Sequence, residues 1–195
     1  METGRKPPPW QWGLLIAIMA ACFMVYLDTA FRQFELLAPP NTREDLLAVG
    51  TLSEDHKDFV EGIGKELKVT KKIEVIMIPT MFFTIARGGR LVQTETSWLV
   101  LIERDFFLRL NIEEQKALIG HELGHIIFIF PRCVFYMSCQ KGADRFAALH
   151  TSPDATIGFL NKLFNSTTDE KRKKEHESRV QYIERLKQGK SLPSR

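Results

Sequence analysis

Two histidines stand four residues apart in the segment 121–125, which reads His-Glu-Leu-Gly-His. Four residues make about one turn of an α-helix, so both side chains project from one face only if this segment is helical. A helix is favoured because Asn111 is a suitable N-cap residue and Glu114 stands three residues later, as in a capping box. The spacing therefore predicts a helix that begins after Asn111, carries both histidines on one face and ends before Pro131.

Two imidazole rings placed in this way can converge on one metal ion, each through a nitrogen about 2 Å from it. Glu122 follows His121 directly and therefore points beside the ion rather than at it. From there a carboxylate can accept a proton from a water molecule that the metal polarises. His121 and His125 are thus the predicted ligands of a Zn²⁺ ion, and Glu122 is the predicted catalytic base. A helix with two incidental histidines is the simpler alternative.

The segments around this helix predict an α+β domain, in which a small antiparallel or mixed sheet packs on the histidine-bearing helix and on further helices. A helix is expected from Ser53 to about Lys68, with a buried face of apolar residues at a spacing of four. Strands are expected at residues 73–78, 82–86, 91–96 and 98–102, with a hairpin turn at residues 87–90. Later helices are expected at residues 142–149, after Ser152 and at residues 169–188.

The N-terminal stretch is long and apolar enough to suggest a membrane anchor. Residues 13–27 carry no charge, and Trp10, Trp12 and Tyr26 lie at the ends of the stretch, where aromatic residues meet the bilayer interface. The predicted organisation is a tail (1–9), one transmembrane helix (10–28), a linker (29–52) and a single domain (53–190). A cleaved signal peptide, or a lipoprotein that is lipidated on Cys22, is the alternative.

The charge distribution and the cysteines indicate which partners and which cellular compartment to expect. A net charge of +3 is too small to indicate a nucleic-acid partner, and the basic run 171–174 is typical of a solvated helix face. Arg5 and Lys6 favour a cytoplasmic N-terminus, which predicts a single-pass membrane protein with an extracytoplasmic domain. Cys133 and Cys139 can pair in an oxidising compartment, although two buried thiols are the simpler expectation.

The stretch 117–126 resembles the zinc helix of the M48 family of metallopeptidases. The stretch 142–147 resembles the Ala-Asp segment of the second active-site helix in that family, and residues 154–163 are similar to the helix that follows. His176 and Arg179 are similar to the closing His-Pro and Arg-Ile pattern, although glutamate replaces the proline. The resemblance covers roughly residues 55–187. It implies a zincin-like fold and a zinc-dependent endopeptidase that acts on proteins or peptides.

The third zinc ligand is where this chain departs from the family. In M48 peptidases a glutamate four residues before the aspartate completes the zinc site, and the aspartate supports a ligating histidine. Here Asp144 stands at the position of the aspartate, and Gln140 stands at that of the glutamate. Ligand chemistry favours Asp144 as the third ligand. Alternatively, Gln140 binds weakly through its amide oxygen while Asp144 supports a histidine, or the site is degenerate and the protein is a silent scaffold.

Overall fold

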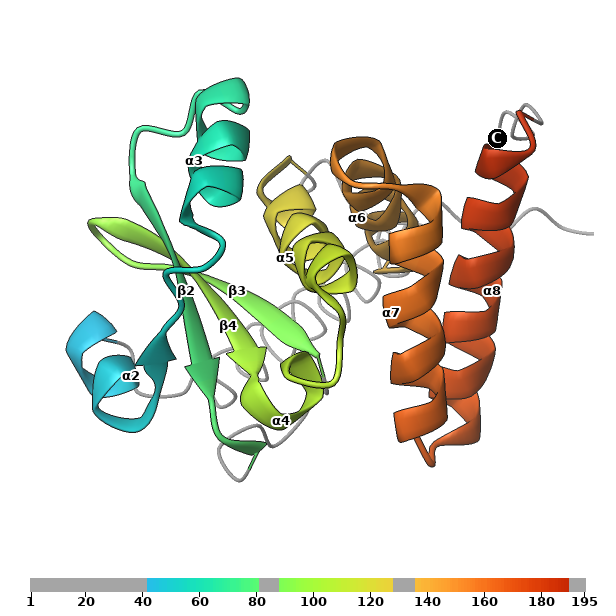
Figure 1. Cartoon of the computed structure of the whole chain (residues 1–195), viewed down its shortest axis with the longest axis horizontal. Coiled ribbons are helices and arrows are strands. Elements are labelled where there is room, and N and C mark those ends of the chain that lie inside the picture. Colours follow the sequence, from blue (N-terminus) through green and yellow to red (C-terminus); the bar gives the residue numbers. More distant parts are fainter. Residues whose placement is uncertain (1–41, 81–87, 128–135, 190–195) are drawn as a thin grey trace, which may run out of the picture. The chain divides into compact units, whose positions relative to one another are not determined.

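The computed structural model describes residues 42–80, 88–127 and 136–189 (Figure 1). The chain divides into two units, Met1–Pro39 and Pro40–Arg195, and all described residues belong to the second. The predicted tail, transmembrane helix and strand 82–86 therefore lie outside the described residues. Among the residues that are described, no helix is both long enough and apolar enough to cross a bilayer.

A four-stranded mixed sheet forms one side of the described unit, as the α+β prediction requires. Its spatial order is β1–β2–β4–β3. The strands are β1 (Thr51–Leu52), β2 (Lys72–Ile78), β3 (Gly89–Gln93) and β4 (Ser97–Glu103). The central strands β2 and β4 are parallel, whereas the outer strands β1 and β3 are antiparallel to their neighbours. The two predicted apolar strands, 73–78 and 98–102, are confirmed as β2 and β4.

The described helices are α2 (Arg43–Val49), α3 (Lys57–Glu66), α4 (Arg104–Phe107), α5 (Ile112–Ile127), α6 (Tyr136–His150), α7 (Pro153–Ser166) and α8 (Glu170–Lys187). The capping box of α5 is confirmed: the Glu114 carboxylate accepts from Asn111 N at 2.8 Å, and the Asn111 side chain accepts from Glu114 N at 2.9 Å. Ser152 and Asp169 cap α7 and α8 through their side chains, which fixes two further predicted helix starts.

Three predicted boundaries are wrong. The turn predicted at residues 87–90 is wrong, because Gly89 and Arg90 belong to β3 and pair with β4. A different turn, at residues 94–96, joins β3 to β4, and there Thr94 N donates to Ser97 O at 2.8 Å. Helix α3 begins at Lys57 and not at Ser53, since Ser53 N extends the pairing of β1 by donating to Val75 O. Helix α6 begins at Tyr136, six residues before the predicted 142.

Part of the predicted linker 29–52 is also folded. Thr42 caps α2 through its side chain, and Leu46 in that helix is buried against the sheet. The Arg43 guanidinium donates two hydrogen bonds, of 2.6 and 2.7 Å, to the carboxylate of Glu74 in β2. This ion pair anchors α2, and burial of Leu46 adds apolar contact, so the domain begins before residue 53.

Both faces of the sheet carry buried apolar residues. Val75, Val100 and Ile102 point into a core shared with α3, α4, α5 and α7. The alternate residues of the same strands, among them Ile76 and Leu101, point to the opposite face and pack with Leu46 of α2. The larger core therefore lies between the sheet and α5, and it holds α5 in place against the sheet.

Helices α5 and α6 approach each other unusually closely because small residues face each other. A Cβ atom added to Gly124 would lie 2.9 Å from the Cα atom of Ala143, and one added to Gly120 would lie 3.3 Å from the Cα atom of Ala147. These two contacts also show that the helices are antiparallel. The close packing brings the face of α5 that carries the histidines against the face of α6 that carries Asp144.

The close contact at Gly124 predicts a large effect of one added methyl group. We expect Gly124→Ala to lower the free energy of unfolding by about 1–3 kcal/mol, because the backbone of Ala143 must move away. Gly62→Ala is the matched control, since Gly62 is an exposed residue of α3 with no atom within 4 Å of an added Cβ. It should stabilise the protein by about 0.5–1 kcal/mol. Urea unfolding measures both, and equal effects would contradict the tight packing.

Candidate functional site

The two histidines of α5 lie side by side, as their spacing predicts. The ring centroids of His121 and His125 are 4.9 Å apart, and the planes of the rings are 86° from parallel. His121 is buried, with 4% of its surface exposed, and Glu122 beside it is equally buried. Both rings and the carboxylate therefore belong to one cluster on the inner side of α5.

His121 is held by a residue from α6. Its Nδ1 atom lies 2.8 Å from Oδ1 of Asp144, a carboxylate that is completely buried. A carboxylate partner favours the tautomer in which Nδ1 carries the proton and donates it, leaving the lone pair on Nε2. This is the tautomer that binds a metal through Nε2.

Arg179 of α8 completes this contact from a third helix. Its Nε and Nη2 atoms each donate to one oxygen of Asp144 at 2.7 Å, which is a bidentate ion pair. Nη2 also lies 3.3 Å from Nδ1 and 3.4 Å from Nε2 of His121. Arg179 is 5% exposed, so the pair is shielded from water.

Burial and the ion pair act in opposite directions on these charges. Burial by itself would raise the pKa of Asp144, but Arg179 and then His121 outweigh it and hold that pKa below its usual range. Burial likewise would lower the pKa of Arg179, but Asp144 outweighs it and raises that pKa. Both groups therefore stay charged at neutral pH, and together they add no net charge to the site.

The position of Asp144 bears on the choice of a third ligand. Both of its oxygens are already engaged, one by His121 and Arg179 and the other by Arg179 alone. This arrangement favours the alternative in which Asp144 supports a ligating histidine, over the one in which Asp144 itself binds the metal. Gln140 lies one turn before Asp144 on α6, just as His125 lies one turn after His121 on the antiparallel α5.

Glu122 faces the sheet rather than α6. A Cβ atom added to Gly89, the first residue of β3, would lie 2.7 Å from Oε1 of Glu122. Only a glycine leaves room for the carboxylate at this point. Burial raises the pKa of Glu122, while His121 and Arg179 partly offset the rise. A carboxylate with a raised pKa is better suited to accepting and returning a proton near neutral pH.

Burial keeps His125 and His176 uncharged at neutral pH. Burial, followed by His121 and Arg179, lowers the pKa of His125 to about 3. Burial, followed by Arg179, lowers the pKa of His176 on α8 to about 4. His176 is 9% exposed, and its Nδ1 atom is buried without a hydrogen-bond partner.

The donor set fits a zinc ion only in part. His121 and His125 offer two imidazole nitrogens on one face of α5, and the carboxylate of Glu122 follows His121 on the same helix. However, no group of three or more His, Cys, Asp or Glu side chains in the described part of the chain is arranged to hold a metal ion.

The sequence alone gave no role to Arg179 or His176 beyond a resemblance at the C-terminus. Their function as partners of the cluster depends on α8 returning to α6, which residue spacing does not reveal. Nothing in the sequence marks Arg179 as a buried residue, because the helix that carries it is otherwise strongly charged.

The expectation of two buried thiols is wrong for Cys139, which is disulfide-bonded. The other cysteines, Cys22 and Cys133, lie outside the described residues.

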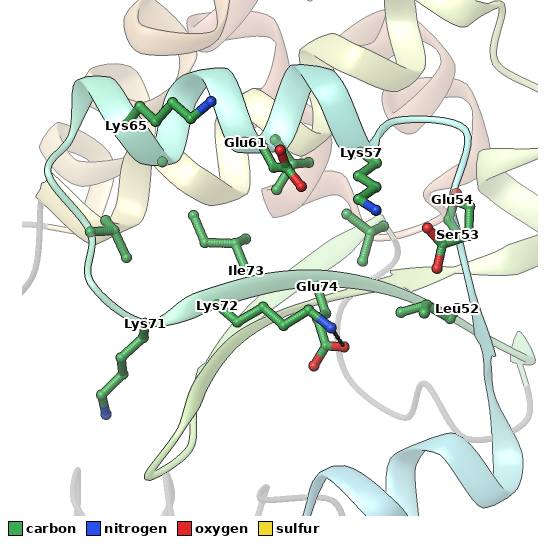
Figure 2. Close-up of a pocket in the computed structure, with 14 residues that line it drawn as sticks. Leu52, Ser53, Glu54, Lys57, Glu61, Lys65, Lys71, Lys72, Ile73 and Glu74 are labelled. Carbon is green, nitrogen blue, oxygen red and sulfur yellow. Dashed lines mark hydrogen bonds and ion pairs between the residues drawn. The ribbon is translucent and has the colours of Figure 1, made fainter.

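A cavity elsewhere in the domain contains none of the predicted site residues. It has a volume of about 280 Å³ and lies between α3 and β2 (Figure 2). Its wall carries both charges, among them Lys57, Lys65 and Glu61. Lys72 at its edge is paired with Glu74 at 2.8 Å. The balance of charges indicates no particular ligand, so the cluster on α5, α6 and α8 remains the candidate site.

Comparisons with models of protein families, with curated proteins and with solved structures found no match for this chain.

The buried ion pair predicts a strong dependence of stability on Arg179. Arg179→Gln should lower the free energy of unfolding by about 3–5 kcal/mol, because it leaves the buried carboxylate of Asp144 without its cation. Lys187→Gln is the control on the same helix, since Lys187 pairs with Asp154 in the exposed ion pair and should cost less than about 1 kcal/mol. Chemical unfolding monitored by circular dichroism measures both, and a small effect of Arg179→Gln would argue against the network.

Proposed function

We propose that this chain is a zincin-like, M48-like zinc metalloendopeptidase, anchored to a membrane by residues 10–28 with an extracytoplasmic catalytic domain. The observation that carries the proposal is the pair His121 and His125 on one face of α5, with the buried carboxylate of Glu122 between them in sequence. The contact between Asp144 and His121 supports it, because carboxylates commonly orient the histidines that bind zinc.

In this proposal each residue of the cluster has a separate task. A zinc ion held by His121, His125 and a third donor would lower the pKa of a water molecule and polarise the carbonyl group of a peptide. Glu122 accepts the proton of the attacking water and later returns it to the leaving amine. Asp144 fixes the orientation of His121, and Arg179 keeps Asp144 ionised.

The edge of the sheet offers a place for an extended peptide. Strand β3 is the last strand in the order β1–β2–β4–β3, so one of its sides carries no other described strand. It begins at Gly89, which contacts the carboxylate of Glu122. A peptide that paired with β3 would run past the catalytic base, which is the usual logic of strand addition. Substrates are therefore proposed to be proteins or peptides bound in extended form.

A catalytically silent scaffold that binds peptides is the second candidate. Gln140 favours it, because an amide is a poorer zinc ligand than the carboxylate that the M48 family has at this position. The absence of a ready group of three ligands among the described residues points in the same direction. Glu122 opposes it, because burying a carboxylate is costly and a scaffold has no use for a base.

Replacement of the base separates the two candidates. We expect the full-length protein, purified in mild detergent, to bind one zinc ion per chain and to cleave casein or a quenched peptide. Glu122→Gln should keep the zinc and lower the cleavage rate by about 10²–10⁴-fold, since the amide cannot take up the proton. Metal analysis and peptide hydrolysis are the two measurements. Zinc without cleavage in either form would support the scaffold, and absence of zinc would reject the metal site.

The contact between Gly89 and Glu122 predicts a second loss of activity. Gly89→Ala places a methyl group where the carboxylate lies, so Glu122 must move. We expect the cleavage rate to fall by about 100-fold while bound zinc stays the same, because a displaced base is poorly aligned with the attacking water. Gly62→Ala, at an exposed position of α3 where an added Cβ meets no atom within 4 Å, is the control and should change neither quantity. Unchanged cleavage by Gly89→Ala would place the base elsewhere.

A further inference from the structure

The outer edge of β2 is only partly covered by β1. The two residues of β1 pair with the second half of β2, and Ser53 N extends this pairing by donating to Val75 O at 2.9 Å. The chain then turns away from the sheet toward α3, which begins at Lys57. The first half of β2, from Lys72 to Glu74, therefore has no residue of β1 paired with it.

The backbone of Ile73 faces this uncovered edge. In an antiparallel pair of strands, every second residue directs both its N–H and its C=O group toward the neighbouring strand. Val75 is such a residue, because its carbonyl oxygen accepts from Ser53. Ile73 lies two positions earlier on the same strand, so its N–H and C=O groups point to the same side. No backbone hydrogen bond from the described residues reaches Ile73 on that side, which leaves one donor and one acceptor for a further strand.

The cavity between α3 and β2 opens beside this edge (Figure 2). Its volume is about 280 Å³, and the apolar part of its lining includes Val60, Gly64, Val69, Ile73 and Val75. Gly64 keeps this part open, because a Cβ atom added there would lie 3.1 Å from Cδ1 of Ile73. Residues that pair across two strands place their side chains on the same face of the sheet. A residue paired with Ile73 would therefore direct its side chain into the cavity.

We propose that the edge of β2 at Ile73 binds an extended peptide segment of a partner protein. The peptide pairs with β2 beyond the point where β1 ends, accepts from the N–H of Ile73 and donates to its C=O. One apolar side chain of the peptide fills the cavity beneath α3. A single extended strand fits this place because the pairing of β1 already sets the register that an added strand would continue.

Backbone pairing also agrees with the charges of the cavity wall. Lysines and glutamates both line it, among them Lys57, Lys65, Glu54 and Glu61, so charge alone selects no ligand. Recognition would depend on the two backbone groups of Ile73 and on apolar contact instead. In the strand order β1–β2–β4–β3 this edge lies on the far side of the sheet from β3. The peptide would therefore bind away from Glu122 and independently of any metal ion.

Peptide affinity and amide exchange of the full-length protein in mild detergent test this site. The probe is a fluorescein-labelled heptapeptide of alternating threonine and valine, residues that favour an extended strand. Its fluorescence anisotropy should rise on binding. The amide of Ile73, followed by NMR, should exchange with solvent at least about tenfold more slowly when the peptide is bound. The same peptide with N-methylated valines is the control and should not bind, because it cannot donate to the C=O of Ile73.

Two variants with matched controls locate the binding site. Ile73→Pro removes the N–H that faces the uncovered edge, whereas Ile73→Ala shortens the side chain and keeps the N–H. Ile73→Pro should weaken peptide binding by about 5–10-fold more than Ile73→Ala, since it leaves a peptide carbonyl unpaired. Gly64→Ala narrows the cavity and should weaken binding by about 3–10-fold. Gly62→Ala, at an exposed position of the same helix, should leave the affinity unchanged.

Each outcome supports or overturns the assignment. Selective losses in Ile73→Pro and Gly64→Ala support it. Equal affinity in wild type and both variants would overturn it and place the peptide elsewhere, for example on β3. Absence of binding to the wild type would overturn it as well. If Ile73→Pro fails to fold by circular dichroism, Gly64→Ala and Gly62→Ala decide.

Amide exchange without peptide identifies other occupants of this edge. Slow exchange of Ile73 that persists on dilution would show that a segment of this chain already covers the edge. Slow exchange that is lost on dilution would show that a second copy covers it. Either result would overturn the proposal. None of these measurements involves zinc or cleavage, so their outcome is separate from that of the proposed peptidase function.

Discussion

The buried ion pair between Asp144 and Arg179 is the interaction on which the rest of the site depends. It joins α6 to α8, which are separated by α7 in the sequence, and it presents one carboxylate oxygen to His121. Without the guanidinium, the fully buried carboxyl group of Asp144 would favour its protonated form. It would then no longer act as the hydrogen-bond acceptor that orients the imidazole of His121. The stability of α8 against the domain and the orientation of a candidate zinc ligand are thus set by the same two hydrogen bonds.

Close backbone contacts place the other two groups. Glycines in α5 let that helix approach α6 closely enough for His121 to reach Asp144, and Gly89 lets the carboxylate of Glu122 lie directly against β3. In each case the absence of a side chain fixes the position of a polar group. The buried core between the sheet and α5 supplies the rigidity that makes these contacts lasting. The site is therefore positioned by regular elements rather than by loops.

Local signals in the sequence predicted what depends on neighbouring residues. Asn111 and Glu114 predicted the start of α5, and the spacing of His121 and His125 predicted that both lie on one face of that helix. Gly88 and Gly89 were the basis for the hairpin turn predicted at residues 87–90. Gly89 instead lies in β3, where the lack of a side chain leaves room for the carboxylate of Glu122. The engagement of Asp144 was not predictable from composition or period, since Arg179 lies 35 residues away. Contacts of that range depend on how whole helices pack.

The burial of Glu122 is the strongest physical reason to prefer an enzyme over a scaffold. Removing a carboxylate from water costs free energy, and the raised pKa of Glu122 expresses that cost. A structural protein would gain by placing an apolar side chain beside the core, where Leu123 already packs. A bound metal cation would offset part of this free energy by favouring the ionised carboxylate. Proton transfer would then give Glu122 a function.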